Sequence, residues 1–339
     1  MVRGHRRLAA TVALLGLGAL PAACSTHGDD GRLVVYSGRT SNLIDPLLQR
    51  FSEESGVAID VRYDDSANLA LLVDEEGDRT PADVFISQSP GAVGYLDEGG
   101  HLTTLPDDVL ALVPEGDAAD DGRWVGLSGR VRTLVHNTGL VDPATLPDSV
   151  LDLADEEYAG QVAVAPTNGS FQDFVTVLRL QVGENEARSF LEGLAANESP
   201  TYSNNTAIVE AVGRGEVPMG LVNHYYAFVA KDENPDLPVK NHFFPAGDYG
   251  STLLVTAASV VEATDHADAA EQLVEFLLSE ESQAYFSEET FEYPLADGAE
   301  ANAALPPFDD VSTTRVDLSE LGGGLEATTE LIDASGLNS

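Results

Sequence analysis

Short strand-like and helix-like segments alternate along this sequence of 339 residues, and the alternation restricts the fold more than any other feature. The runs "LVVYS" (33–37), "VAIDVRY" (57–63) and "ADVFIS" (82–87) have strand character, and apolar residues at helical spacing occupy 42–56 and 67–77 between them. Strand–helix–strand order predicts a largely parallel sheet with helices on both faces. We therefore expect an α/β protein.

The same alternation begins again after a long β-rich stretch at 124–138, which contains Gly126 and Gly129. We interpret this stretch as the place where the chain passes between two α/β lobes. Ligand-binding groups are then expected at strand ends that face a cleft between the lobes. In the second half we predict strands at 161–166, 217–223 and 252–261, and helices at 171–183, 185–198, 205–216 and 267–286.

Acidic residues dominate the charge of the chain: 57 Asp and Glu stand against 17 Lys and Arg, a formal net charge of −40. The hydrophobic share of 43% is that of a globular protein, so the acidity does not indicate disorder. Without a basic stripe the chain cannot neutralise the phosphates of a nucleic acid, and we expect no nucleic-acid partner. The excess of carboxylates predicts a solvated acidic surface.

The first 24 residues have the organisation of a targeting segment. Arginines precede an apolar run at 8–20 that is too short for a comfortable membrane span. Cys24 ends "PAAC" and is the only cysteine, which excludes an intramolecular disulfide framework and thiolate metal clusters. Its position resembles the bacterial lipoprotein cleavage box, although Pro21 departs from the usual aliphatic residue, and ordinary secretion is the alternative. We predict a signal peptide at 1–24, lipidation of Cys24 and a flexible tether at 25–32, with the protein anchored to the outer face of the cell membrane.

Motifs of the common enzyme classes are missing from the sequence. It has no G-x-S-x-G elbow, no Walker lysine loop, no H-E-x-x-H and no dinucleotide fingerprint after the first strand. The seven histidines are scattered, and carboxylates are too abundant for any pair to be singled out as acid and base. We therefore predict that the chain is not an enzyme. A metal-dependent hydrolase, the competing class, would have to turn over a phosphoester.

Polar residues cluster at three turns where a predicted strand leads into a helix: "APTNGSFQDF" (165–174), "YSNNTAIVEAV" (202–212) and "YSGRTSNLIDP" (36–46). Free backbone N–H groups at a helix start, together with hydroxyl and amide side chains, can hold an anion. Simple N-capping of the helices is the alternative. Three such turns predict a ligand site shared between the lobes.

Tyr225 and Tyr226 are the only adjacent tyrosines in the chain, and they follow a predicted strand. Packing is the plain explanation, since aromatic residues are common in strands. The alternative is that two phenol oxygens bind a cation strong enough to displace their protons, whose pKa is ordinarily about 10. Phenolate is a hard oxygen donor and suits a hard cation such as ferric iron, whereas zinc favours His or Cys and calcium favours carboxylates.

The chain resembles the bacterial ferric-ion binding proteins, the solute receptors of iron(III) uptake ABC transporters. The resemblance extends from residue 33 over nearly all of the remaining chain. It implies a two-lobed periplasmic-binding-protein fold (type II-like) that closes on its ligand, with strand crossovers as the hinge. We predict an N-terminal lobe of 33–128 plus 254–303 and a C-terminal lobe of 129–253 plus 304–339. The motifs that carry the resemblance are "VVYSGR" (34–39), "RTPADVFIS" (79–87), "LSGRVR" (127–132), "PTNGSF" (166–171), "NHYY" (223–226) and "EYPL" (292–295).

The resemblance implies that Tyr225 and Tyr226 are the ligands of ferric iron (Fe3+). In the related proteins that use phosphate, the N-terminal lobe adds a histidine and a glutamate. Here Thr40 takes the place of the histidine and Gln88 that of the glutamate, so this lobe offers at most weak or indirect metal contacts. His224 precedes the tyrosines, but neighbouring positions rarely all face one ion, and we do not expect it to be a ligand.

A synergistic anion, phosphate or carbonate, is also implied by the resemblance. Arginine forks suit such oxyanions, so Arg39 and Arg130 are further candidates, with a surface ion pair as the alternative for each. The residues that match the family's anion site are Asn168, Gly169, Ser170, Asn205 and Asn223.

The function expected from the resemblance is capture of ferric iron with its anion and delivery to an ABC importer, made of a permease and its ATPase. We expect a monomer. The competing hypothesis is a receptor of the same fold that binds an oxyanion or a small organic anion without iron, and the two substitutions in the N-terminal lobe favour it.

Overall fold

The computed structural model describes residue 1 and residues 31–88, 90–311 and 324–338, and Gly31–Ser339 form one compact unit. Apart from Met1, the predicted signal peptide and Cys24 lie outside the described residues, as does most of the predicted tether. Among the helices of the described part, none is long and apolar enough to cross a membrane.

A mixed sheet of six strands, in the order β10-β4-β9-β3-β1-β2, forms one half of the compact unit. β1 pairs in parallel with β2 and β3, whereas β9 runs antiparallel to β3 and β4. The expectation of a largely parallel sheet is wrong here, because β9 enters this sheet from the other half of the unit and runs against its neighbours. The strands are β1 (Leu33–Ser37), β2 (Ile59–Tyr63), β3 (Val84–Ser87), β4 (Val125–Arg130), β9 (Leu254–Val260) and β10 (Tyr293–Pro294).

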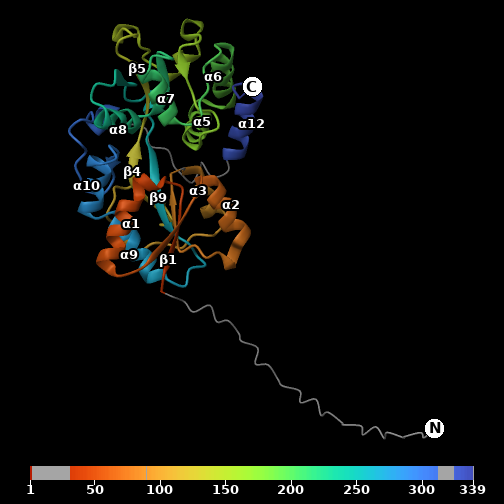
Figure 1. Cartoon of the computed structure of the whole chain (residues 1–339), viewed down its shortest axis with the longest axis vertical. Coiled ribbons are helices and arrows are strands. Elements are labelled where there is room, and N and C mark those ends of the chain that lie inside the picture. The colour runs from red at the N-terminus through yellow and green to blue at the C-terminus, as the bar shows by residue number, and fades with distance from the viewer. Residues whose placement is uncertain (2–30, 89, 312–323, 339) are drawn as a thin grey trace. The chain divides into compact units, whose positions relative to one another are not determined.

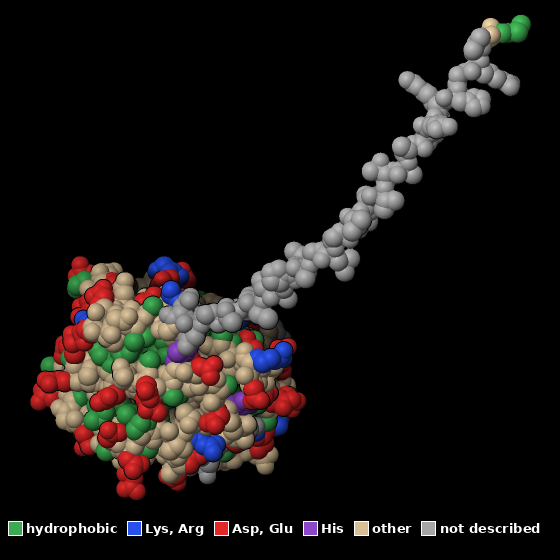
Figure 2. Space-filling view, turned by 90° about the horizontal axis from the view of Figure 1, so that it is seen from below, with side chains coloured by type: hydrophobic (Ala, Val, Ile, Leu, Met, Phe, Trp, Pro, Cys, Tyr) green, Lys and Arg blue, Asp and Glu red, His purple; other side chains and the backbone are tan. Residues whose placement is uncertain are grey.

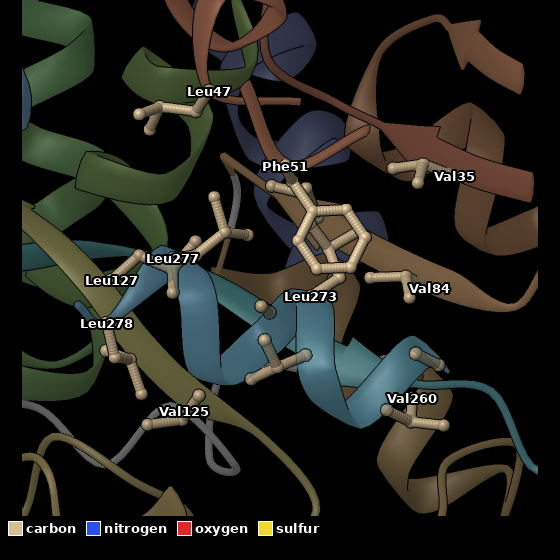
Figure 3. Packing of buried hydrophobic residues seen from close by; sticks show 14 of the residues in the cluster. Val35, Leu47, Phe51, Val84, Val125, Leu127, Val260, Leu273, Leu277 and Leu278 are labelled. Carbon is tan, nitrogen blue, oxygen red and sulfur yellow. The ribbon is translucent and has the colours of Figure 1, made fainter. Parts of the chain in front are cut away.

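Helices cover both faces of this sheet, as predicted. Val84 and Ile86 of β3 belong to one apolar cluster and Phe85 between them belongs to another, because successive side chains of a strand point to opposite faces. In the first cluster Phe51 of α1 and Leu273 of α9 lie against strand valines (Figure 3). The helices of this half are α1 (Ser41–Ser55), α2 (Ser66–Glu76), α3 (Pro90–Glu98), α4 (Asp107–Leu110), α9 (Ala267–Leu277) and α10 (Glu280–Glu288).

The single helix predicted at 267–286 is two helices in the structure. α9 ends at Leu277, and the side chain of Ser279 accepts a hydrogen bond from the backbone N–H of Ser282 at the start of α10. A serine in this position satisfies one of the N–H groups that a new helix leaves free. The cap therefore starts a second helix where periodicity alone indicates one.

A second mixed sheet, in the order β6-β7-β5-β8, forms the other half. Its strands are β5 (Arg132–Asn137), β6 (Val162–Ala163), β7 (Met219–Asn223) and β8 (Val239–Phe243). The helices α5 (Gly169–Val182), α6 (Glu184–Ala196), α7 (Asn205–Gly213), α8 (Tyr225–Glu233) and α12 (Leu325–Ser335) pack around it, and the short α11 (Phe308–Val311) precedes the undescribed segment before α12. The sequence patterns did not predict β8, β10, α3, α4, α8, α11 or α12.

The stretch 124–138 passes between the two sheets, as interpreted. β4 ends at Arg130 in the first sheet and β5 begins at Arg132 in the second, so Val131 alone separates them. Within the compact unit, Figure 1 shows β1, α1, α2 and α9 at one end and β5, α5, α6 and α7 at the other, with β4 and β9 between. The lobe limits at 128/129, 253/254 and 303/304 remain a prediction.

Close packing near the start of β4 requires a glycine. A Cβ atom at Gly126 would lie 2.9 Å from the backbone oxygen of Asp117, which no side-chain rotation relieves.

Acidic side chains outnumber basic ones on the face of the molecule in Figure 2. This face agrees with the predicted acidic surface.

Candidate metal centre

The two adjacent tyrosines lie on the first turn of α8, directly after β7 ends at Asn223. Their rings are stacked, with centroids 4.3 Å apart and an interplanar angle of 28°. Tyr225 is 1% exposed and Tyr226 is half-buried, and both line the same cavity. The turn from strand to helix therefore brings two phenol groups to one place.

Burial raises the pKa of Tyr225 well above its ordinary value, and the neighbouring Tyr226 and Glu292 raise it further. Arg130 and Arg39 act in the opposite direction. The phenol of Tyr225 is consequently neutral at pH 7 unless a cation compensates for the loss of solvent around the phenolate.

The cavity beside the tyrosines has a volume of about 970 Å³ and is lined by residues from both halves of the compact unit. Thr40 and Gln88 come from the first half, and the turn at the start of α5 comes from the second. Among the described residues, no group of three or more His, Cys, Asp or Glu side chains is placed to hold a metal ion. The oxygen donors on the wall that were predicted from the sequence are those of Thr40, Gln88, Asn168, Ser170, Tyr225 and Tyr226.

Gln88 connects the first half directly to the tyrosines. Its Nε2 donates a hydrogen bond of 3.0 Å to the phenol oxygen of Tyr225, and its backbone N–H donates to Ser66. The amide supplies no negative charge where a carboxylate would. Thr40 is an exposed residue of the cavity wall whose carbonyl oxygen accepts from Leu43 in α1. The structure thus places Gln88 in contact with a tyrosine and Thr40 on the wall.

The turn 168–170 is tied to α7 by side-chain hydrogen bonds. The Oδ1 atom of Asn168 accepts from the hydroxyl of Ser170 at 2.7 Å and from the amide of Asn205 at 3.0 Å, and it makes no capping bond to α5. The first backbone N–H groups of a helix have no acceptor within it. In α5 those of Phe171 and Gln172 donate to the carbonyl oxygen of Asn168, which leaves those of Gly169 and Ser170 for a ligand. Simple capping does describe the second turn, where the Oδ1 atom of Asn204 accepts from Ala207 at 2.9 Å.

Arg132 is the residue of this site that sequence reasoning missed. It lies on β5, is 1% exposed, and donates to the amide oxygen of Asn223 at 2.8 Å and to the carbonyl oxygen of Leu221 at 2.9 Å. Longer contacts of 3.4 Å join it to Ser170 and Asn205. Burial and the neighbouring charge of Arg130 lower its pKa to about 9, which leaves the guanidinium positive at pH 7. The available signal was an arginine among strand-forming residues in "VRTLV" (131–135).

Arg39 forms a buried ion pair. Its two terminal nitrogens lie 3.0 and 2.6 Å from the carboxylate oxygens of Glu292, and one of them also donates to Thr256 at 2.8 Å. The ion-pair alternative is therefore realised, although in the interior instead of on the surface. Sequence reasoning also missed the carboxylate that completes this pair.

Arg130 is also buried and lies 3.8 Å from the carboxylate of Asp173. It donates to the backbone carbonyl oxygen of Gln88 as well. Four of the predicted anion-site residues do not belong to the cavity wall: Arg39, Arg130, Asn205 and Asn223. Direct binding of an anion by Arg39 or Arg130 stays a prediction, and their contacts do not favour it.

His224 is fully buried next to the tyrosines but is engaged elsewhere. Its ring nitrogens contact the backbone N–H of Val131 at 3.3 Å and the carbonyl oxygen of Phe291 at 2.8 Å. These bonds hold the imidazole between the strand crossing and the segment that precedes β10. The expectation that His224 does not join the tyrosines agrees with this placement.

Acid should destabilise the fold through His224. Burial lowers its pKa from the ordinary 6.5 to about 4, so between these values the unfolded chain takes up a proton that the folded chain does not. Unfolding should become easier by up to about 3 kcal/mol as the pH falls from 6.5 to 4, and the full stability is retained above pH 6.5. Urea unfolding across this range should show a flatter pH dependence for His224→Gln. Parallel curves for the two proteins would contradict the assignment.

Two α/β halves joined by crossing strands, with a cavity lined from both sides, define the class of two-lobed solute-binding proteins. A model of the family described as bacterial extracellular solute-binding protein matches residues 79–313, and the chain belongs to this family. Members of the family are solute-binding transport proteins and not enzymes, and they act outside the cytoplasm.

Similar proteins bind iron. The Fe(3+)-binding periplasmic protein of Serratia marcescens is 28% identical over 337 residues, which are 98% of this chain and 97% of the relative. Iron-bound HitA from Pseudomonas aeruginosa matches with a TM-score of 0.86 and 32% identity over 90% of this chain and 99% of HitA. A Trichodesmium protein (IdiA, FutA) in complex with iron and citrate has a TM-score of 0.77 and 26% identity, over 90% of this chain and 99% of that protein. These similarities confirm the resemblance to the bacterial ferric-ion binding proteins and the two-lobed α/β fold.

Proposed function

We propose that the protein captures ferric iron together with an oxyanion in the cavity between its lobes and delivers it to an ABC importer. The observation that carries the proposal is the position of two stacked phenols on the cavity wall that also contains the polar turn at the start of α5. The names of the Serratia and Pseudomonas relatives, which bind iron, support it. Delivery then requires a permease and its ATPase, and the protein acts as a monomer.

In this proposal Tyr225 and Tyr226 bind the iron as phenolates, and the cation offsets the cost of deprotonating a buried phenol. Gln88 and Thr40 add neutral oxygen or amide contacts, so the N-terminal lobe contributes little charge. The oxyanion, phosphate or carbonate, lies against Asn168, Gly169 and Ser170. The citrate in the Trichodesmium structure makes an organic carboxylate a third candidate.

The proposal is tested by equilibrium dialysis of the chain from Ser25 onward, which retains the whole compact unit. The protein is stripped with a chelator and dialysed against ferric iron with phosphate, carbonate or citrate, and bound metal and anion are counted by mass spectrometry. We expect one iron per chain together with one anion. Bound phosphate without iron would instead support the competing hypothesis, a receptor of the same fold that binds an oxyanion alone. The uncharged side chains of Gln88 and Thr40 favour that hypothesis.

Restoring a charge at Gln88 should strengthen iron binding. In Gln88→Glu a carboxylate replaces the amide that contacts the Tyr225 oxygen at 3.0 Å, and ferric iron prefers anionic oxygen donors. We expect an affinity at least about 10-fold higher in competition with citrate, the scale of effects at groups around a metal. Gln172→Glu adds the same charge to the cavity wall from α5 and is the matched control. An equal increase of iron affinity in both variants would show a general effect of negative charge, and would contradict a contact between Gln88 and the iron site.

We also propose that Cys24 carries the lipid that holds the protein at the outer face of the membrane. Support comes from "PAAC" after a short apolar run at the N-terminus. Expression of Cys24→Ala in the native cell should move the protein from the membrane fraction to the soluble extracytoplasmic fraction. An unchanged distribution would favour ordinary secretion and cleavage.

A further inference from the structure

Arg132 differs from the other fully buried arginines in the described part of the chain. Arg39 is paired with Glu292, and Arg130 lies 3.8 Å from Asp173. Arg132 has no carboxylate partner among the described residues, and its terminal nitrogens contact amide, hydroxyl and carbonyl oxygens. A positive charge is therefore buried beneath the turn 168–170 without a carboxylate in direct contact, and Asp173, the ion-pair partner of Arg130, acts on it only from a distance.

The guanidinium fixes the orientation of two asparagine side chains. Because arginine only donates hydrogen bonds, the side chain of Asn223 must turn its oxygen toward Arg132, at 2.8 Å. The oxygen of Asn205 likewise faces Arg132, at 3.4 Å, and the backbone N–H of Asn223, at 3.2 Å. The NH₂ groups of both asparagines must therefore point away from Arg132.

These two NH₂ groups have different surroundings. That of Asn205 donates to Asn168 and to Ser170 at 3.0 and 3.1 Å and so holds the turn in shape. That of Asn223 is buried and has no acceptor among the described residues, and Asn223 itself is 0% exposed. A buried donor without an acceptor is rare in native proteins and indicates a missing partner. The partner must be an acceptor, and an oxyanion is one.

We propose that Arg132 is the positioning residue of the oxyanion site: it turns the donor side of Asn223 toward the ligand, shapes the 168–170 turn through Asn205, and compensates part of the ligand's negative charge. The inference rests on the proposed function for the location of the oxyanion, but not on the presence of iron. The network joins residues of the second half of the compact unit only, so the effect of Arg132 can be measured without iron.

The test is calorimetric titration of inorganic phosphate into the iron-free chain from Ser25 onward. Arg132→Lys keeps the charge but replaces the planar fork by a single nitrogen, and Arg132→Gln removes the charge as well. We expect phosphate affinity to fall about 10-fold in the first and about 100-fold in the second, the range seen for groups that orient a site's ligands. Arg188→Gln, on the partly exposed face of α6, should leave the affinity unchanged.

Asn223→Asp separates positioning from folding. The aspartate provides Arg132 with the carboxylate it lacks, so the variant should keep the wild-type melting temperature while losing measurable phosphate binding. A folded Arg132→Gln protein with wild-type phosphate affinity would overturn the inference, as would a wild-type protein that binds no phosphate without iron.

Iron loading of the same proteins distinguishes this inference from the proposed function. Phosphate binding that depends on Arg132 in a protein that never takes up iron would refute the iron proposal and retain the inference. Iron uptake together with a phosphate affinity that does not depend on Arg132 would retain the iron proposal and refute the inference.

Discussion

Tyr225→Phe and Tyr226→Phe should each weaken ferric iron binding by at least about 100-fold, and the double variant should not retain iron against citrate. Changes at groups that only orient metal ligands already cost about 10- to 100-fold, and here a ligand itself is removed. Phenylalanine keeps the stacked rings, whose centroids are 4.3 Å apart, so the first turn of α8 should be preserved. The measurement is competition between protein and citrate for iron.

The matched control is Tyr158→Phe, which removes a phenol oxygen from a buried tyrosine of the same half. That oxygen contacts the carbonyl of Thr145 at 3.4 Å, and Tyr158 does not line the cavity. Its iron affinity should equal that of the wild type. A double variant of Tyr225 and Tyr226 that holds iron as tightly as the control would exclude the tyrosines as ligands.

Arg39→Met should lower the free energy of unfolding by about 3–5 kcal/mol, because it leaves the carboxylate of Glu292 buried without its main partner. Both side chains of the pair are 0% exposed, and the shortest distance between them is 2.6 Å. The matched control is Arg50→Met. Its pair with Glu281 is partly exposed at 2.7 Å, and its loss should cost less than about 1 kcal/mol.

The double variant Arg39→Met with Glu292→Met should recover most of the lost stability, since two apolar side chains of similar volume replace both charges. Urea unfolding of the wild type, both single variants and the double variant measures the coupling between the two residues. An Arg39→Met protein within about 1 kcal/mol of the wild type would show that Glu292 finds compensation in Ser128, Thr290 and Arg130, and would contradict the prediction.

Much of the fold could be predicted because its strongest signals are local. The strand at 33–37 has the predicted bounds, and the stretch 124–138 crosses between the sheets as interpreted. The direction of β9 could not be predicted, since it depends on how the chain returns from the second sheet. β8 was missed because "VKNHF" at 239–243 is polar, and its pairing with β5 makes it a strand.

The candidate site could be predicted where a turn follows a strand, because topology brings such turns to one edge. Tyr225, Tyr226, Gln88 and the turn 168–170 line one cavity for that reason. Pairings between distant residues carry no local signal: Arg39 and Glu292 are 253 positions apart, and Arg132 meets Asn223 91 positions away. The contacts of the buried arginines therefore became visible only in the structure.

The visible absorption spectrum tests the central claim most directly. The chain from Ser25 onward is stripped with a chelator and given ferric citrate with phosphate or with carbonate. The account predicts a phenolate-to-iron charge-transfer band that rises to a plateau at one iron per chain. The absence of such a band with every anion would contradict a tyrosinate iron site and leave a receptor that binds an oxyanion alone.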